Sequence, residues 1–104
     1  MAKAVVPCPV EEAIQLIGGK WKLLVLRSLL LNGPQRYHEL LGTVTAISQK
    51  ELTRNLRALT NAGLVRRDSG TSRTAAYELT RLGSGLMPTF KKLLVWGTKL
   101  PASR

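Results

Sequence analysis

Cysteine, histidine and acidic residues are scarce in this chain of 104 residues, and each scarcity argues against a class of protein. The single cysteine, Cys8, cannot form a disulfide within the chain and fits a reducing compartment. The single histidine, His38, is distant in sequence, and two isolated ligands do not predict a metal site. Paired carboxylates, a histidine placed beside a nucleophile and a phosphate-binding glycine motif are all missing. We therefore expect no enzyme activity, no metal and no cofactor.

Long apolar runs are also missing. The longest, Leu23 to Leu26, ends at Arg27, whereas a membrane-spanning helix needs about 20 apolar residues. The first residues carry no apolar core of the kind found in signal peptides. We expect one cytoplasmic domain over residues 1–104, without membrane attachment.

Basic residues are abundant: 16 Lys and Arg against 6 Asp and Glu give a net charge of +10. Such a charge attracts polyanions, so nucleic acid is the favoured partner, ahead of an anionic membrane surface. Eight of the basic residues lie between positions 36 and 81, where only four acidic residues occur. They are Arg36, Lys50, Arg54, Arg57, Arg66, Arg67, Arg73 and Arg81.

Residues 48–62 have the strongest helix pattern in the chain. Ser48 and Glu51 have the spacing of a capping box, which predicts the start of the helix. Gly63 follows the last helical residue, where a glycine commonly ends a helix. The apolar positions repeat on one side at Leu52, Leu56 and Leu59. That side must face a core.

The other side of this predicted helix carries Gln49, Lys50, Thr53, Arg54 and Arg57. These side-chain types read base edges and hold phosphates. We predict base contacts for the first four, a phosphate contact for Arg57, and a place in the same DNA-binding surface for Ser48. A solvated charged face is the alternative, but Glu51 is the only acid on this helix and the cap already uses it.

The remaining elements follow from apolar periodicity and from glycine and proline signals. We predict helices over residues 9–17, 20–31 and 38–44, a short strand at 36–37, and strands at 64–68 and 75–79. A last helix runs over about residues 80–99, with a kink at Pro88. The helices within residues 38–62 form a helix-turn-helix, and residues 64–79 form a basic hairpin, the wing. A helix-turn-helix followed by a basic hairpin indicates a winged helix-turn-helix.

The wing offers three further contacts to DNA, Arg66, Arg67 and Arg73, with Arg36 as an additional candidate for a phosphate. Side chains alternate along a strand, so one of Arg66 and Arg67 is expected to face away from DNA. The last helix has more apolar surface than one small domain can cover, which indicates an interface.

Several motifs occur in a fixed order: Cys8-Pro9-Val10-Glu11, Ile17-Gly18-Gly19-Lys20-Trp21, Gly33-Pro34, Leu52-Thr53-Arg54-Asn55-Leu56-Arg57, Gly63-Leu64-Val65 and Tyr77-Glu78-Leu79-Thr80. In this order the chain resembles the HxlR-type regulators, a MarR-like branch of the bacterial winged-helix transcription factors, over about residues 8–97. The resemblance implies an α+β, mainly helical, winged helix-turn-helix domain with a C-terminal dimerisation helix. His38 and Thr45-Ala46 depart from the family pattern at a helix start and at the turn.

The resemblance also implies a homodimer whose contact involves the first and last helices, with the helix that begins at Ser48 in the major groove and the wing on the flanking backbone. The interface residues expected on these two helices are Val10, Ile14, Phe90, Leu94 and Trp96.

Cys8 has two readings. Relatives of this type sense electrophiles or oxidants through an N-terminal cysteine, and the resemblance extends that role to Cys8. At the start of a helix the helix dipole favours a thiolate. The alternative is an inert thiol buried under Trp21, since free cysteines are often buried.

Taken together, these patterns predict a transcriptional regulator that binds a pseudo-palindromic operator as a homodimer and responds to a small-molecule or oxidant effector. Two alternatives stay open. A winged helix can bind a protein partner instead of DNA, and a basic surface can bind nucleic acid or an anionic membrane without sequence preference.

Overall fold

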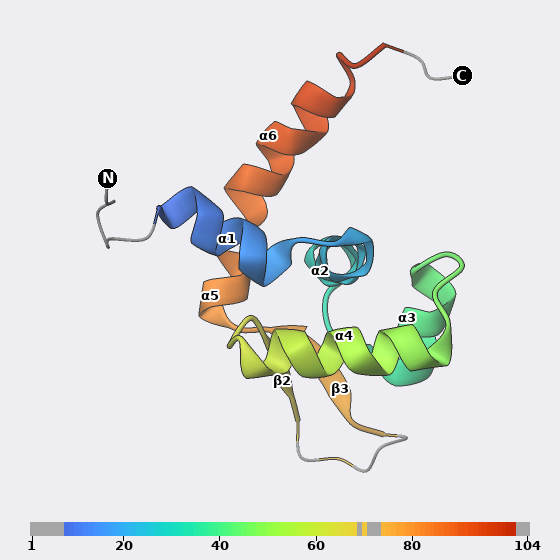
Figure 1. The fold of residues 1–104 in the computed structure, drawn as a ribbon. Coiled ribbons are helices and arrows are strands. Elements are labelled where there is room, and N and C mark those ends of the chain that lie inside the picture. Colours follow the sequence, from blue (N-terminus) through green and yellow to red (C-terminus); the bar gives the residue numbers. More distant parts are fainter. Residues whose placement is uncertain (1–7, 69, 71–73, 102–104) are drawn as a thin grey trace.

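The computed structural model describes residues 8–68, 70 and 74–101 (Figure 1). The elements are α1 (Pro9–Ile17), α2 (Lys20–Asn32), β1 (Gln35–Arg36), α3 (Tyr37–Thr43), α4 (Gln49–Asn61), β2 (Val65–Arg67), β3 (Ala76–Leu79), α5 (Arg81–Ser84) and α6 (Met87–Gly97). The strands form one antiparallel sheet in the order β1-β3-β2. The predicted α+β, mainly helical, winged helix-turn-helix class is confirmed.

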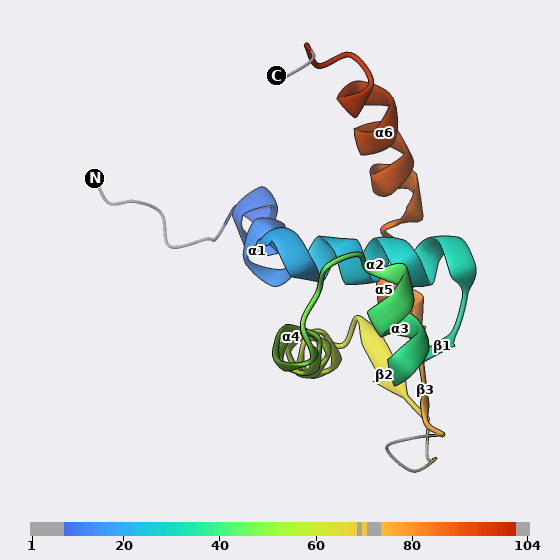
Figure 2. The same cartoon turned by 90° about the vertical axis from the view of Figure 1, so that its right-hand side faces the viewer.

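Helix α2 occupies the middle of the molecule, as the apolar residues on most of its sides indicate. Figures 1 and 2 show α1 and α6 on one side of α2, and α4 with the sheet on the other. The core between α2 and α4 consists of Val25, Leu26, Leu29, Leu52, Leu56 and Leu59, each at most 2% exposed. Burying a side chain of this size contributes about 1.5–3 kcal/mol. The predicted inward stripe of α4 is therefore confirmed.

A buried polar cluster fixes the short strand β1 between α2 and α3. The side chain of Gln35 is only 5% exposed. Its Nε2 donates to the carbonyl oxygen of Ser28 at 3.1 Å and to Ser28 Oγ at 2.8 Å, and its Oε1 accepts from Thr43 Oγ1 at 2.8 Å. Because a buried amide is costly unless it is hydrogen-bonded, these bonds hold the start of the helix-turn-helix in one position.

The strand β1 and the helix α3 each begin one residue earlier than predicted. The strand ends at Arg36 and the helix begins at Tyr37, so His38 lies inside the first turn and is not the capping residue. The cap comes from Glu39, whose Oε1 accepts from the backbone amide of Arg36 at 2.7 Å. A carboxylate in the first turn satisfies an amide that the helix cannot, and it also suits the positive end of the helix dipole.

The prediction of one last helix over residues 80–99 is wrong. The chain forms α5, turns at Gly85 and Leu86, and begins α6 at Met87. Pro88 lies in the first turn of α6, where its missing amide has no helical partner to lose, so it helps to begin a helix and does not kink one. Gly83 in α5 packs against the carbonyl oxygen of Leu64 so closely that a β-carbon would collide with it. This contact packs α5 against the residue that precedes β2.

Among the described residues, no helix is long and apolar enough to cross a membrane. Within the same part of the chain, no group of three or more His, Cys, Asp or Glu side chains is placed to hold a metal ion.

The turn between α3 and α4 contains a strained residue. Ala46 has a φ of 70°, a conformation that costs a residue with a β-carbon about 1–2 kcal/mol. Glycine adopts it without strain but loses roughly 0.5–1 kcal/mol more chain entropy on folding.

Ala46→Gly should therefore raise the free energy of unfolding by up to about 1 kcal/mol, measured by urea denaturation at fixed protein concentration. Ala58→Gly, inside α4, is the control and should lower it by about 1 kcal/mol. A loss at position 46 as large as that at position 58 would rule out the strain.

Candidate nucleic-acid interface

The N-terminus of α4 is capped as predicted and is also tied to α2. Ser48 Oγ accepts from the amide of Glu51 at 3.1 Å, and Glu51 Oε1 accepts from the amide of Ser48 at 3.4 Å. The other carboxylate oxygen, Oε2, accepts from Trp21 Nε1 at 3.1 Å. Trp21 in turn has the ammonium of Lys20 over its ring, 4.5 Å from the centroid. Both oxygens of Glu51 are thus engaged at the end of the helix.

The outer side of α4 carries the predicted polar and basic residues. Gln49, Lys50, Thr53, Arg54 and Arg57 are all exposed. In the part of the chain that the structure describes, the three basic side chains of this set form no salt bridge. Lys50, Arg54 and Arg57 follow the i, i+4, i+7 spacing and so share one stripe of the helix. The result is a cationic stripe in which, as far as the structure describes the chain, no member is paired with a carboxylate.

Thr53 is more constrained than the sequence indicated. The hydroxyl of Tyr37 donates to the carbonyl oxygen of Gln49 at 2.9 Å and lies 2.8 Å from Thr53 Oγ1. Because the Tyr37 proton is used on Gln49, the Thr53 hydroxyl is the donor in the second bond. Thr53 therefore keeps its methyl group and its acceptor capacity for a partner, but not its proton.

The two neighbouring arginines of β2 lie on opposite faces of the sheet. Val65 is buried beneath α4, and Arg67, two residues later, shares that face. Arg66 lies on the other face, where its Nε and Nη2 donate to Glu78 Oε2 across the strand pair at 3.0 and 2.8 Å. The predicted alternation is confirmed, and the ion pair partly neutralises Arg66. Arg36, at the end of β1, is exposed, whereas Arg73 lies outside the described residues.

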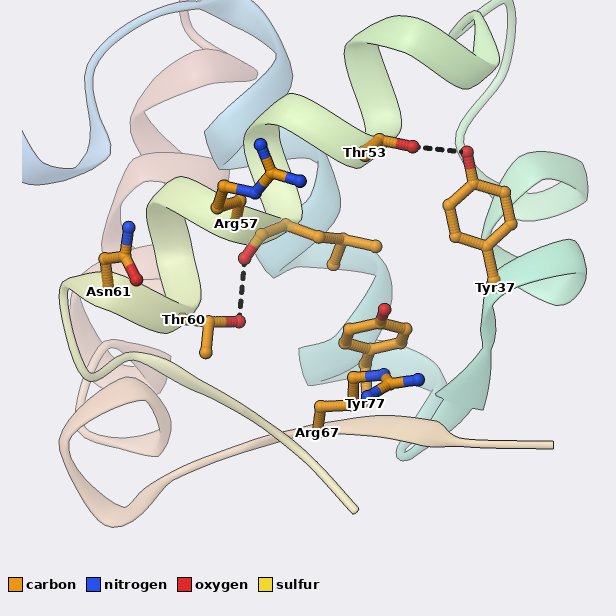
Figure 3. Close-up of a pocket in the computed structure, with 8 residues that line it drawn as sticks. Tyr37, Thr53, Arg57, Thr60, Asn61, Arg67 and Tyr77 are labelled. Carbon is orange, nitrogen blue, oxygen red and sulfur yellow. Dashed lines mark hydrogen bonds between the residues drawn. The ribbon is translucent and has the colours of Figure 1, made fainter. Parts of the chain in front are cut away.

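A groove of about 320 Å³ opens between α4 and the sheet (Figure 3). Its lining residues are Tyr37, Thr53, Leu56, Arg57, Thr60, Asn61, Arg67 and Tyr77. We call this the α4–wing groove. The sequence analysis did not predict that Tyr37 or Tyr77 belongs to the DNA-binding surface. Only the strand register places Tyr77 opposite Arg67. The pairing brings two arginines and two phenol rings from four elements to one opening.

Asp68 tethers the base of the wing. Its Oδ1 accepts from the amide of Gly70 at 3.0 Å and from the amide of Ala76 at 3.1 Å. These two hydrogen bonds, followed by the charges of Arg67 and Arg36, hold the pKa of the Asp68 carboxyl below its ordinary value and outweigh the opposing effect of desolvation. An ionised Asp68 is therefore part of the folded wing.

Cys8 and the predicted interface residues lie on the side of α2 away from the wing. Cys8 is exposed at the N-cap of α1, so the alternative of a thiol buried under Trp21 is wrong. Val10, Ile14, Leu94 and Trp96 are between 59% and 63% exposed. Phe90 is less available, since it lines a small apolar cavity with residues of α1 and α2, among them Ile17 and Leu26.

Comparison with known proteins gives a consistent result. A family model described as HxlR-like helix-turn-helix matches residues 16–103. The chain is 41% identical over 92 residues to the uncharacterized HTH-type transcriptional regulator YkvN of Bacillus subtilis, covering 86% of this chain and 77% of that protein. It is also similar to the quinone-bound structure of YodB from B. subtilis, with a TM-score of 0.78, 32% identity and coverage of 89% and 100%. The oxidized form of the redox regulator HypR gives a TM-score of 0.79 and 32% identity, with coverage of 92% and 100%.

The lowered pKa of Asp68 predicts a pH dependence with a definite sign. The ionised carboxylate stabilises the folded wing above the unfolded-state pKa, about 3.9 for aspartate. That stabilisation is lost as the pH falls through the lower folded-state pKa. Titration of the Asp68 carboxyl carbon by NMR should give a midpoint below the ordinary value. In Asp68→Ala, acidification from pH 5 to pH 3 should cause a smaller loss of stability than in the wild type. An ordinary midpoint would contradict the tether.

Proposed function

The chain belongs to the HxlR-like helix-turn-helix family of transcriptional regulators, and on this premise we propose that it binds duplex DNA with sequence specificity as a homodimer. The observation that carries the proposal is the cationic stripe of Lys50, Arg54 and Arg57 on α4. Among the described residues this stripe has no carboxylate partner, and the one acid of the helix is engaged by its cap and by Trp21. A long-range attraction to phosphates is the consequence.

The N-terminal half of α4 enters the major groove of the DNA. Gln49, Lys50 and Arg54 carry donors of the kind that read adenine and guanine edges, and the methyl group of Thr53 suits the methyl group of thymine. Ser48 orients this end of the helix and lies at its surface. The backbone contacts come from the far end of α4 and from the wing and its neighbouring strand, through Arg57, Arg36, Arg67 and Arg73. Arg66, which pairs with Glu78 on the other face of the sheet, faces away from the DNA. Phosphate contacts set the register in which the bases are read.

A second copy of the chain covers the apolar side chains of α1 and α6. Val10, Ile14 and Trp96 are 63%, 59% and 60% exposed, and neither helix contains a buried residue. Large apolar side chains left exposed on two helices indicate an interface. A two-fold symmetric dimer places two copies of α4 about one turn of duplex apart, roughly 34 Å, which requires a pseudo-palindromic operator.

Oxidants or electrophiles regulate this dimer through Cys8. The thiol is exposed at the first residue before α1, beside the apolar surface that a second copy covers. The similar proteins YodB and HypR have structures with a bound quinone and in an oxidized form, respectively. Modification of Cys8 alters the packing of α1 against the partner and thereby the spacing of the two α4 helices.

Selection from a pool of random duplexes at physiological salt, with reduced protein, tests the function. A two-fold symmetric motif bound at least about a thousandfold more tightly than random DNA supports a dimeric regulator. Binding that ignores sequence and disappears as salt is raised identifies an electrostatic surface instead. Absence of DNA binding leaves the winged-helix protein-interaction module as the remaining alternative.

Arg54→Ala should separate base reading from phosphate binding. If Arg54 contacts a base, its loss weakens binding to the selected operator by about 1–3 kcal/mol and weakens binding to random DNA less. Competition binding on the two DNAs measures the difference. Arg81→Ala, which removes the same charge from α5, is the matched control and should affect both DNAs equally. Equal losses on both DNAs with Arg54→Ala would refute the base contact.

Cys8→Ala should abolish any response of operator binding to oxidation. The wild-type dimer treated with diamide, which takes up two electrons and two protons as two Cys8 thiols join, should change its operator affinity by roughly 5- to 150-fold. Cys8→Ala should bind as the reduced wild type does, with or without diamide, because the chain contains no other thiol. An equal response of the variant would exclude Cys8 as the sensor.

A further inference from the structure

We propose that the α4–wing groove holds a single phosphodiester of the DNA backbone, gripped by Arg57 from the helix and Arg67 from the sheet. The proposal rests on the proposed function, since it names a contact within the same complex. Figure 3 shows Arg57 on the α4 side of the groove, and Arg67 with Tyr77 on the sheet side. Two guanidinium groups on opposite sides of one opening suit a phosphate, which can accept hydrogen bonds from both at once.

The charges around the groove favour an anion. Its lining contains two arginines and no carboxylate. Arg57 forms no ion pair within the described residues. The carboxylate that follows Arg67, Asp68, accepts the amides of Gly70 and Ala76 and forms no salt bridge with Arg67 in the described part of the chain. In contrast, Arg66 is bound to Glu78 on the other face of the sheet.

The hydroxyl groups of the groove differ in what they can still donate. Tyr37 donates to Gln49, and Thr60 Oγ1 donates to the carbonyl oxygen of Leu56 at 2.7 Å. The phenol hydroxyl of Tyr77 has no hydrogen-bond partner within residues 8–68, 70 and 74–101. The phenol of Tyr77 is therefore a third donor for the same phosphate, supplied by the strand residue that pairs with Arg67.

The position of the groove selects the DNA backbone as its occupant. Arg57 is the last member of the stripe that begins with Lys50 and Arg54, so the groove continues the surface proposed to lie on the DNA. A helix whose N-terminal half lies among base edges meets the sugar–phosphate backbone further along its length. The wing borders the same point, and the two elements close on one phosphate from either side.

Salt dependence counts the phosphates that the protein neutralises. The slope of the logarithm of the binding constant against the logarithm of salt concentration is about −0.9 for each phosphate. The substitutions Arg57→Gln, Arg67→Gln and their combination keep the aliphatic packing and remove the charges. If both arginines hold one phosphate, the double variant loses about 1 in slope per half-site. If they hold two separate phosphates, it loses about 2.

A neutral methylphosphonate at one linkage at a time locates the phosphate. At one position in each half-site, neutralisation should weaken the wild type roughly tenfold and leave the double variant unaffected. Tyr77→Phe should lose several-fold in affinity on normal DNA and nothing on DNA neutralised at that linkage. Arg66→Gln is the matched control, because Arg66 pairs with Glu78 on the other face of the sheet. Any loss of affinity that it causes should be equal on normal DNA and on DNA neutralised at that linkage.

These experiments distinguish failure of the shared phosphate site from failure of the proposed DNA-binding function. Two results would refute the shared phosphate and leave the proposed regulator standing, provided that the wild type prefers its operator. In the first, the double variant keeps its loss of affinity on every neutralised DNA. In the second, the salt slope of the double variant falls by about 2 per half-site. If the wild type shows no preference for any duplex, the regulator and the phosphate site both fail.

Discussion

The hydrogen bond between Trp21 and Glu51 is the interaction on which the placement of the α4 surface depends. The apolar stripe of α4 buries the helix against α2, but burial has no direction and would allow the helix to slide or turn. A charge-assisted bond at the first turn, 3.1 Å long, fixes the depth and rotation of that end. The same carboxylate accepts from the amide of Ser48. One side chain thus begins the helix, orients it, and removes the only acid from its outer face.

Once α4 is fixed, the sheet decides what each basic residue faces. Adjacent residues of a strand point to opposite faces. Arg66 therefore pairs with Glu78 on one face, while Arg67 lines the α4–wing groove on the other. The buried Gln35 cluster holds β1 beside β3, and the tether of Asp68 holds the turn into the wing. The basic residues of this protein therefore differ in how far a nearby carboxylate neutralises them. Arg57 and Arg67 lie where the helix and the hairpin converge, whereas Arg66 is partly neutralised on the reverse face of the sheet.

The opposite side of α2 has the reverse character. A chain of this size builds one modest core, and α2, α3, α4 and the sheet complete it. Helices α1 and α6 contribute little to that core and present apolar side chains such as Ile14 and Leu94 outward. The break at Gly85 and Leu86 directs α6 away from the body (Figure 2). The exposed thiol of Cys8 at the start of α1 therefore lies on the same side of the molecule as these exposed apolar side chains.

The sequence by itself determined the elements whose signals are local: the capping box at Ser48, the stripe of Leu52, Leu56 and Leu59, and the order of helices and strands as far as β3. These depend on neighbours within a turn or a strand, so periodicity suffices to find them. Only the tertiary structure decided that Pro88 begins a helix, that Cys8 is exposed, that Tyr37 engages Thr53, and that Arg67 and Arg57 share a groove. Each of these depends on residues brought together from distant parts of the chain by burial and strand register. A local sequence pattern cannot predict such contacts.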